Sequence, residues 1–160
     1  MLKDLDEQLV KAFPLLYRDR DLDKHSNRNT LMPYGFSCGD GWFKLIFDLS
    51  SELEPIVRSA ARVAGFKNFF IKNLNHVINL FGGNSIELND KIPRAVQVKE
   101  KFGGLRFYVR PSNSKIIAIV SRYEALSYNI CMKCGAKDGS LRKDKSWWMT
   151  LCDECNKFRT

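Results

Sequence analysis

Two Cys-x-x-Cys pairs near the C-terminus constrain the fold of this chain more than any other feature. Cys131 and Cys134 form the first pair, and Cys152 and Cys155 form the second after seventeen intervening residues. Each pair is typical of a tight turn that directs two sulfurs to one point, and seventeen residues suffice for a hairpin between the turns. We therefore expect a zinc ribbon with one tetrahedral Zn²⁺ site, the alternatives being two disulfides or four free thiols. Four Cys ligands close the coordination, so a structural metal is expected rather than a hydrolytic one.

The length and composition predict a core that folds without help from the metal. The chain has 160 residues, of which 44% are hydrophobic, enough for one domain of ordinary size. We divide it into an α+β core domain at residues 1–128 and a zinc-ribbon appendage at 129–160. No apolar run approaches the roughly 20 residues of a membrane span, so no membrane partner is expected. Charged residues directly after Met1 and the unpaired Cys38 favour a reducing cytoplasm without a signal peptide.

Hydrophobic periodicity predicts the elements of the core and the α+β fold class. A helical N-terminal half is expected to pack on a small antiparallel hairpin, before the zinc ribbon. Pro55 and a capping box at residues 51–54 predict a kink or a break in the second helix, and Gly65 predicts its end. The expected helices cover residues 4–17, 42–64, 68–80 and 114–127, the hairpin covers 95–109, and a short strand covers 147–151.

The stretch from Cys38 to Trp42 is a secondary candidate site. Its sequence, Cys-Gly-Asp-Gly-Trp, stands directly before a predicted helix, where Asp40 is placed to cap the free N–H groups. A loop at a helix N-terminus suits an anion or a reactive thiolate, which gives Cys38, Asp40 and Trp42 a functional interpretation. The structural interpretation, a capped turn with a buried Trp42, is favoured because no His or other base stands nearby in the sequence.

The positive charge is concentrated after residue 90. Of the net charge of +8, residues 91–110 contribute +5 and residues 129–160 contribute +3. Basic and aromatic residues of the hairpin alternate with apolar ones, so they are expected on one solvent-facing side. Such a face suits nucleic acid or an acidic protein surface, and a merely solvated face is the alternative. The expected binding residues are Lys99, Lys101, Arg106, Tyr108, Arg110, Arg142, Lys143 and Lys145.

Three stretches together resemble a family of small uncharacterised proteins of bacteriophages and prophages. They are Cys-Gly-Asp-Gly-Trp at residues 38–42, Gln-Val-Lys-Glu-Lys-Phe-Gly-Gly-Leu-Arg-Phe-Tyr at 97–108, and the closing Cys-x-x-Cys-Gly with Thr-Leu-Cys-Asp at 150–153. The resemblance covers roughly residues 31–155. In similar sequences the last zinc position is often His where this chain has Cys155, and either residue completes a tetrahedral site. The resemblance implies a phage accessory protein acting in the bacterial host cytoplasm, and it implies no reaction.

Three functions are compatible with these features. The first is a nucleic-acid-binding module that uses the basic hairpin face and the zinc ribbon. The second is an inhibitor that binds an acidic surface of a host protein, such as a component of antiviral defence. The third is an enzyme that uses Cys38, Asp40, Lys101 or Arg106. An enzyme is least favoured, because no catalytic set is evident and the metal site is closed.

Overall fold

The structure, a computed structural model, describes residues 1–25, 30–78 and 91–159, without the side chains of 66–78. Within this part of the chain it contains four α-helices and two small antiparallel sheets, which confirms the α+β class. The helices are α1 (Lys3–Ala12), α2 (Phe43–Ile78), α3 (Ser114–Leu126) and α4 (Asp153–Lys157), with single 3₁₀ turns η1 (Met32–Tyr34), η2 (Asp40–Trp42) and η4 (Ser127–Asn129). The strands are β1 (Arg94–Lys101), β2 (Gly104–Arg110), β3 (Ser140–Arg142) and β4 (Met149–Leu151), paired β1 with β2 and β3 with β4.

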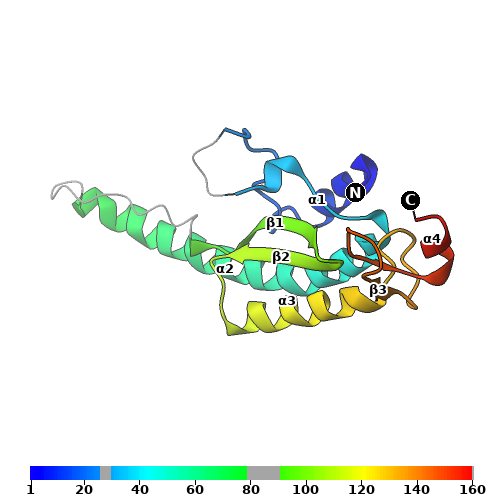
Figure 1. Cartoon of the computed structure of the whole chain (residues 1–160). Coiled ribbons are helices and arrows are strands. Elements are labelled where there is room, and N and C mark those ends of the chain that lie inside the picture. The colour runs from blue at the N-terminus through cyan, green and yellow to red at the C-terminus, as the bar shows by residue number, and fades with distance from the viewer. Residues whose placement is uncertain (26–29, 79–90, 160) are drawn as a thin grey trace.

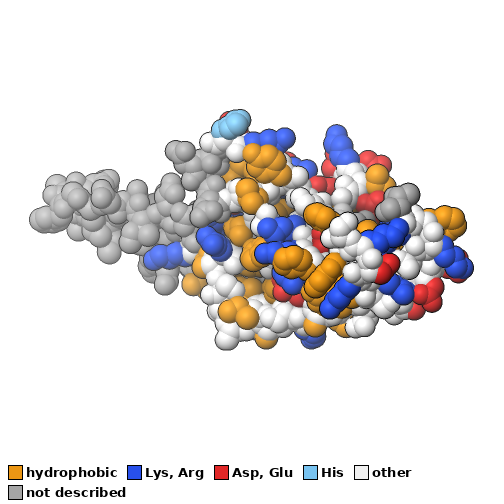
Figure 2. Space-filling model, viewed as in Figure 1, with side chains coloured by type: hydrophobic (Ala, Val, Ile, Leu, Met, Phe, Trp, Pro, Cys, Tyr) orange, Lys and Arg blue, Asp and Glu red, His pale blue; other side chains and the backbone are white. Residues whose placement is uncertain are grey.

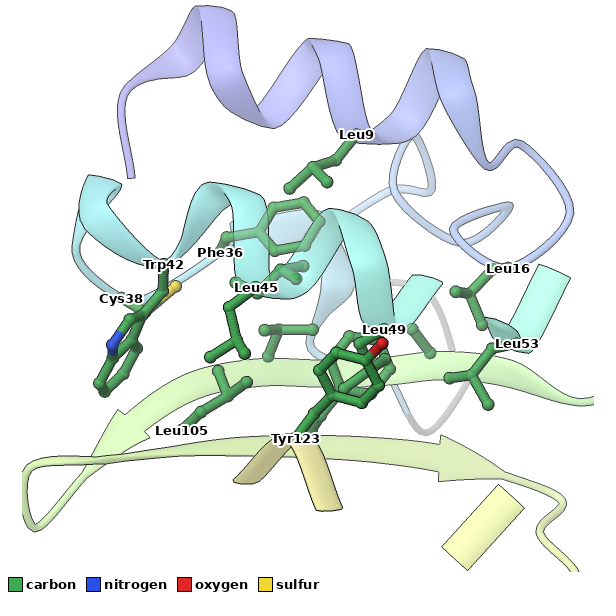
Figure 3. Close-up of a cluster of buried hydrophobic side chains, with 14 of the residues drawn as sticks. Leu9, Leu16, Phe36, Cys38, Trp42, Leu45, Leu49, Leu53, Leu105 and Tyr123 are labelled. Carbon is green, nitrogen blue, oxygen red and sulfur yellow. The ribbon is translucent and has the colours of Figure 1, made fainter. Parts of the chain in front are cut away.

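Helix α2 runs beside α3 (Figure 1), and its N-terminal part lies between α1 and the β1–β2 hairpin (Figure 3). Helix α3 packs against both α2 and β2. Apolar side chains from these elements form one buried core, with Leu9 from α1, Leu49 and Leu53 from α2, and Leu105 from β2. Burying each such side chain stabilises the fold by about 1.5–3 kcal/mol. The core thus fixes one apolar face of the hairpin and leaves the other outside.

Both edges of the hairpin are occupied by other parts of the chain. Along β1, Ser37 donates its N–H to the Val98 carbonyl and accepts from the Glu100 N–H, at 3.0 and 2.8 Å. Along β2, the Leu105 N–H donates to Ser127 Oγ at 2.9 Å, and the Phe107 N–H donates to Glu124 Oε1 at 2.8 Å. These four backbone groups of the hairpin edges are therefore satisfied within the chain.

Helix α1 ends at Ala12, five residues before the end of the helix expected at residues 4–17. The next residue, Phe13, has φ −129° and ψ 62°. It precedes Pro14, whose ring disfavours the helical conformation of the residue before it. Pro14 therefore ends the helix. The following residues form turns that Glu54 holds against α2, since its carboxylate accepts from the Leu16 N–H at 2.9 Å.

Of the two alternatives for this helix, a kink or a break near Ser51, the break is contradicted, and the predicted end at Gly65 is wrong. The helix runs without interruption from Phe43 to Ile78, through Pro55. Ser51 forms no cap, and its Oγ donates to the Phe47 carbonyl at 2.9 Å. An interior Pro costs about 3 kcal/mol. The buried residues Leu49, Leu53 and Val57 hold both sides of it in the core. Residues 79–80 of the further expected helix lie outside the described residues.

The smaller expected elements are partly confirmed. Asn113 caps α3, because its Oδ1 accepts from the Ile116 N–H at 3.0 Å. The strand expected at 147–151 begins only at Met149, so Trp147 and Trp148 precede it. None of the described helices is both long enough and apolar enough to span a membrane.

Candidate metal centre and adjoining surface

The four cysteines of the two pairs meet at one point, as their spacing predicts. Their sulfurs lie within 4.8 Å of one another, and Cys134 Sγ lies 3.7 Å from Cys152 Sγ. The first pair sits in a turn closed by the Gly135 N–H, which donates to the Cys131 carbonyl at 2.8 Å. Cys152 caps α4, and its sulfur accepts from the Cys155 N–H at 3.4 Å. The cluster is therefore a site that can bind a metal ion.

The electrostatics of the cluster favour a cation. Burial raises the pKa of the Cys131 thiol, but hydrogen bonds from the backbone N–H groups of Cys134, Cys152 and Lys133 outweigh it and lower that pKa to about 6. In contrast, the pKa of the Cys155 thiol is raised to about 12, first by its hydrogen bond with the Cys134 thiol and then by its own desolvation. The four sulfurs cannot all carry negative charge on their own. A bound metal ion would supply the positive charge that releases the remaining protons.

One side of the cluster is fitted closely against the stretch from residue 38 to 42. A Cβ atom at Gly39 would collide with the Met132 carbonyl oxygen, and one at Gly41 would collide with the Cys131 carbonyl oxygen. The Gly41 N–H donates to the Met132 carbonyl at 3.0 Å. Trp42 is fully buried, and its indole Nε1 donates to the Ile130 carbonyl at 2.8 Å. The two glycines thus allow a backbone-to-backbone contact that no larger residue permits.

The other side of the cluster receives the tip of the β1–β2 hairpin. The two-residue turn is Phe102 and Gly103, with φ of 55° and 75°, the combination that a type I′ turn requires. A Cβ atom at Gly103 would collide with Leu141 of β3. Thr150 of β4 donates its hydroxyl to the Gly103 carbonyl at 2.6 Å, in a buried position. Three separate motifs of the sequence therefore meet around the four cysteines.

The secondary candidate site at Cys38, Asp40 and Trp42 has structural contacts throughout. Burial, above all, raises the pKa of the Cys38 thiol to about 12, so no thiolate forms there at neutral pH. Asp40 does not cap the following helix as expected. It lies inside the 3₁₀ turn and accepts from the Leu2 N–H at 2.6 Å. Chemistry at this stretch would need an accessible reactive group, and its thiol and indole are both buried.

The basic residues of the hairpin share one solvent-facing side. Lys99 of β1 stands directly opposite Arg106 of β2, and the Lys99 ammonium lies 5.8 Å from the centre of the Tyr108 ring. Arg106 donates to the Tyr128 hydroxyl at 3.2 Å, a bond that raises its pKa and holds the guanidinium in place. Arg110 is exposed at the end of β2. Lys and Arg side chains gather here among hydrophobic ones (Figure 2).

The three basic candidates in the cysteine loop have different surroundings. Arg142 pairs with Asp153 at 2.5 Å, and Lys145 donates to the Arg159 carbonyl at 2.5 Å. The Lys143 ammonium instead lies over the Trp148 ring, 4.7 Å from its centre. Of the three, Lys143 is the one whose described contact is with an aromatic face.

Three exposed aromatic side chains beside the hairpin tip were not among the expected site residues. Phe102 is 62% exposed, Trp147 is 68% exposed, and Trp148 is 40% exposed. The Phe102 and Trp148 ring centres lie 6.0 Å apart. Together with Glu100, Lys101 and Ser146 they line a cleft of about 460 Å³. The signal in the sequence was the Trp-Trp pair inside a charged loop, and the strand expected at 147–151 included both residues.

Comparisons with protein-family models, curated proteins and solved structures gave no match to this chain.

Proposed function

We propose that this protein is a nucleic-acid-binding module, built around a structural zinc ribbon, that acts as a phage accessory protein in the host cytoplasm. The observation that carries the proposal is the basic face of the hairpin, where Lys99, Lys101, Arg106 and Arg110 lie on the same side as Tyr108. Phosphate oxygens are the ligands that such a face suits, because each neutralised phosphate releases counterions.

The four cysteines fit Zn²⁺. In a tetrahedral Cys₄ site with Zn–S bonds of about 2.3 Å, neighbouring sulfurs lie about 3.8 Å apart. The 3.7 Å separation of the Cys134 and Cys152 sulfurs agrees with this geometry. Cys131, Cys134, Cys152 and Cys155 would hold the ion, which completes its coordination with protein ligands alone. Its role would be to fix the turn and the β3–β4 pair against which the hairpin tip rests.

A second candidate function is inhibition of a host protein with an acidic surface. The observation that favours it is the exposure of Trp147 and Trp148 beside lysines, because Trp is enriched among residues that dominate protein interfaces. The two functions differ in their response to salt and nuclease. A polyanion gives a steep and linear dependence of log affinity on log salt, whereas a protein interface is dominated by a few buried contacts.

The test is a salt titration of binding to labelled DNA and RNA between about 50 and 200 mM salt. The variant is Lys99→Ala, Lys101→Ala and Arg110→Ala together, which leaves the Arg106–Tyr128 bond in place. The matched control removes three positive charges elsewhere, by Lys3→Ala, Lys11→Ala and Lys44→Ala on α1 and α2. We expect the hairpin variant to bind more weakly and to flatten the salt slope by up to about two to three units.

The control variant is expected to keep the slope and nearly all of the affinity. Equal slopes in the wild type and the hairpin variant would overturn the proposal for this face. A host protein that the wild type retains after nuclease treatment, in stoichiometric amount, would establish the inhibitor instead.

A further inference from the structure

We propose that the cleft between the hairpin tip and the Trp147–Trp148 loop binds an unpaired base, so that the preferred substrate is single-stranded nucleic acid. This inference rests on the proposed function and adds the substrate class to it. The cleft is defined by Phe102, Trp147 and Trp148, with Glu100, Lys101 and Ser146 as its other lining residues.

The first observation is the position of Phe102. Its φ of 55° lies in the left-handed region, which costs an L-residue with a Cβ about 1–2 kcal/mol. Asn, Asp or Gly is the usual residue at the first position of a type I′ turn. Its ring is 62% exposed, so it contributes little to the core. A residue that is unfavourable for the turn and is mostly exposed points to a use outside the fold.

The second observation is the rigidity of the tip that carries this ring. The Gly103 N–H donates to Glu100 Oε1 at 2.6 Å, and the Gly103 carbonyl accepts from the Thr150 hydroxyl at 2.6 Å. Phe102 is therefore held on a fixed turn and not on a free loop. The Glu100 carboxylate faces the cleft but is tied to this turn by the same bond. A rigid aromatic ring stacks on a base with less loss of side-chain entropy than a mobile one.

The third observation is the arrangement of cations around the rings. The Lys101 ammonium lies 5.3 Å from the centre of the Phe102 ring, and the Lys143 ammonium lies 4.7 Å from the centre of the Trp148 ring. A base stacked on the exposed side of this aromatic cluster would place its flanking phosphates near these two ammonium groups. Lys101 also belongs to the basic face of the hairpin, so a strand that follows the face reaches the cleft.

These features favour a single strand over a duplex. Stacking on an aromatic side chain needs an exposed π-face, and paired bases in a helix offer none along its length. An aromatic platform next to a cationic groove is the combination with which proteins bind single strands without sequence preference. The cleft volume of about 460 Å³ also lies within the roughly 300–1,000 Å³ of ordinary ligand sites.

The test compares binding of an oligo(dT) strand of about 16 nucleotides with binding of a duplex of equal length. The variants are Phe102→Asn, which suits the left-handed turn and so preserves the fold, and Trp148→Ser. We expect the wild type to prefer the single strand and its tryptophan fluorescence to be quenched on binding. Each variant should weaken single-strand binding about 5- to 150-fold and leave the salt slope unchanged. Trp148→Ser should also reduce the quenching.

The control is Leu2→Asn, which changes an exposed apolar residue next to α1 and should leave binding unchanged. Single-strand and duplex affinities that are equal, with no effect of Phe102→Asn, would overturn the inference while the proposed function stands. Absence of any binding to the single strand or the duplex would overturn both. In a further outcome, the Phe102→Asn variant loses a host protein that the wild type binds stoichiometrically while it keeps its DNA binding. That result would assign the cleft to a protein partner and overturn the inference.

Discussion

Both sides of the cysteine cluster have glycines at close contacts, but the neighbouring aromatic side chains are buried on one side and exposed on the other. On one side, Gly39 and Gly41 let two backbones touch, and the neighbouring Trp42 is fully buried. On the other side, Gly103 lies close to the Leu141 side chain of β3, yet the neighbouring Phe102 and Trp148 stay exposed. The chain can therefore bury a large aromatic ring at this cluster. The first side thus anchors the cluster, and the exposed rings of the second side are those that we propose contact a ligand.

Replacing Cys131 by Ser is expected to have the largest effect, because it breaks both sides at once. The variant loses a buried ligand, and the contacts of both sides depend on the turn that this ligand holds. Bound zinc should fall from one equivalent per chain to near zero, and the free energy of unfolding should fall by more than about 4 kcal/mol. Elemental analysis and urea unfolding measure these quantities. Lys133→Ala, at an exposed position in the same turn, should keep both. Less than half an equivalent of zinc in the wild type would contradict the proposed zinc site.

The two tryptophan environments are compared directly by Trp42→Ala and Trp147→Ala. The first substitution empties a buried site and leaves the Ile130 carbonyl without its donor, so it should lower the free energy of unfolding by about 3–5 kcal/mol. The second removes an exposed ring and should change stability by less than about 0.5 kcal/mol. Chemical denaturation measures both values. Equal losses would mean that Trp147 is part of the core, and the comparison would fail.

The close backbone contact of the anchoring side is tested by Gly41→Ala. The added Cβ would collide with backbone atoms of the cysteine turn, which side-chain rotation cannot relieve. We expect a loss of about 1–3 kcal/mol in the free energy of unfolding, together with weaker retention of the metal against a chelator. Gly65→Ala is the matched control, since nothing lies within 4 Å of its added Cβ and it sits inside α2. That variant should gain about 0.5–1 kcal/mol. A neutral Gly41→Ala would show that the contact is looser than described.

The buried thiol of the anchoring side predicts a dependence of stability on alkaline pH. Burial raises the pKa of Cys38 from 9.0 to about 12, so the folded chain retains a proton that the unfolded chain releases. This contribution is complete below pH 9 and is lost as the pH rises towards 12, by about 1.4 kcal/mol for each unit. Cys38→Ala should lack it, which appears as a smaller loss of stability between pH 9 and 11 in denaturation curves. Nucleic-acid binding at neutral pH should not change in this variant. A parallel pH dependence in both proteins would show that Cys38 is accessible to solvent.

The smallest expected effect is a gain of stability on the partner side. Phe102→Asn should raise the free energy of unfolding by about 1 kcal/mol, because Asn adopts the left-handed conformation at lower cost. Thermal unfolding of the zinc-bound protein measures this gain. The same substitution is proposed to weaken single-strand binding, so stability and binding would change in opposite directions. A loss of stability would indicate that the ring supports the fold.

The sequence predicts those features whose signal is local and chemical. The spacing of the cysteines predicts their convergence, and the alternation between residues 95 and 109 predicts the hairpin with its basic face. Asn113 is also a local signal, because its side chain caps the first turn of α3. In each case the residues that give the signal also make the contact.

The features that the sequence did not predict depend on neighbours distant in the chain. Pro55 is a local break signal, and core packing of the helix on both sides outweighs it. Gly65 costs a helix only about 1 kcal/mol, too little to end α2 alone. Asp40 is a good capping residue that bonds to the distant Leu2 instead. The cleft at Phe102 arises only when the hairpin tip and the β3–β4 loop are brought together.

The closed edges of the hairpin restrict how any partner can bind. An exposed strand edge invites another chain to add a strand, which is both a mode of peptide recognition and a route to aggregation. Here Ser37 bonds along β1, and the side chains of Ser127 and Glu124 take the N–H groups of Leu105 and Phe107 along β2. Recognition by β-augmentation is therefore blocked at these positions. Any partner would therefore have to contact side chains on the open face of the hairpin, and the closed positions are protected from pairing with a strand of another chain.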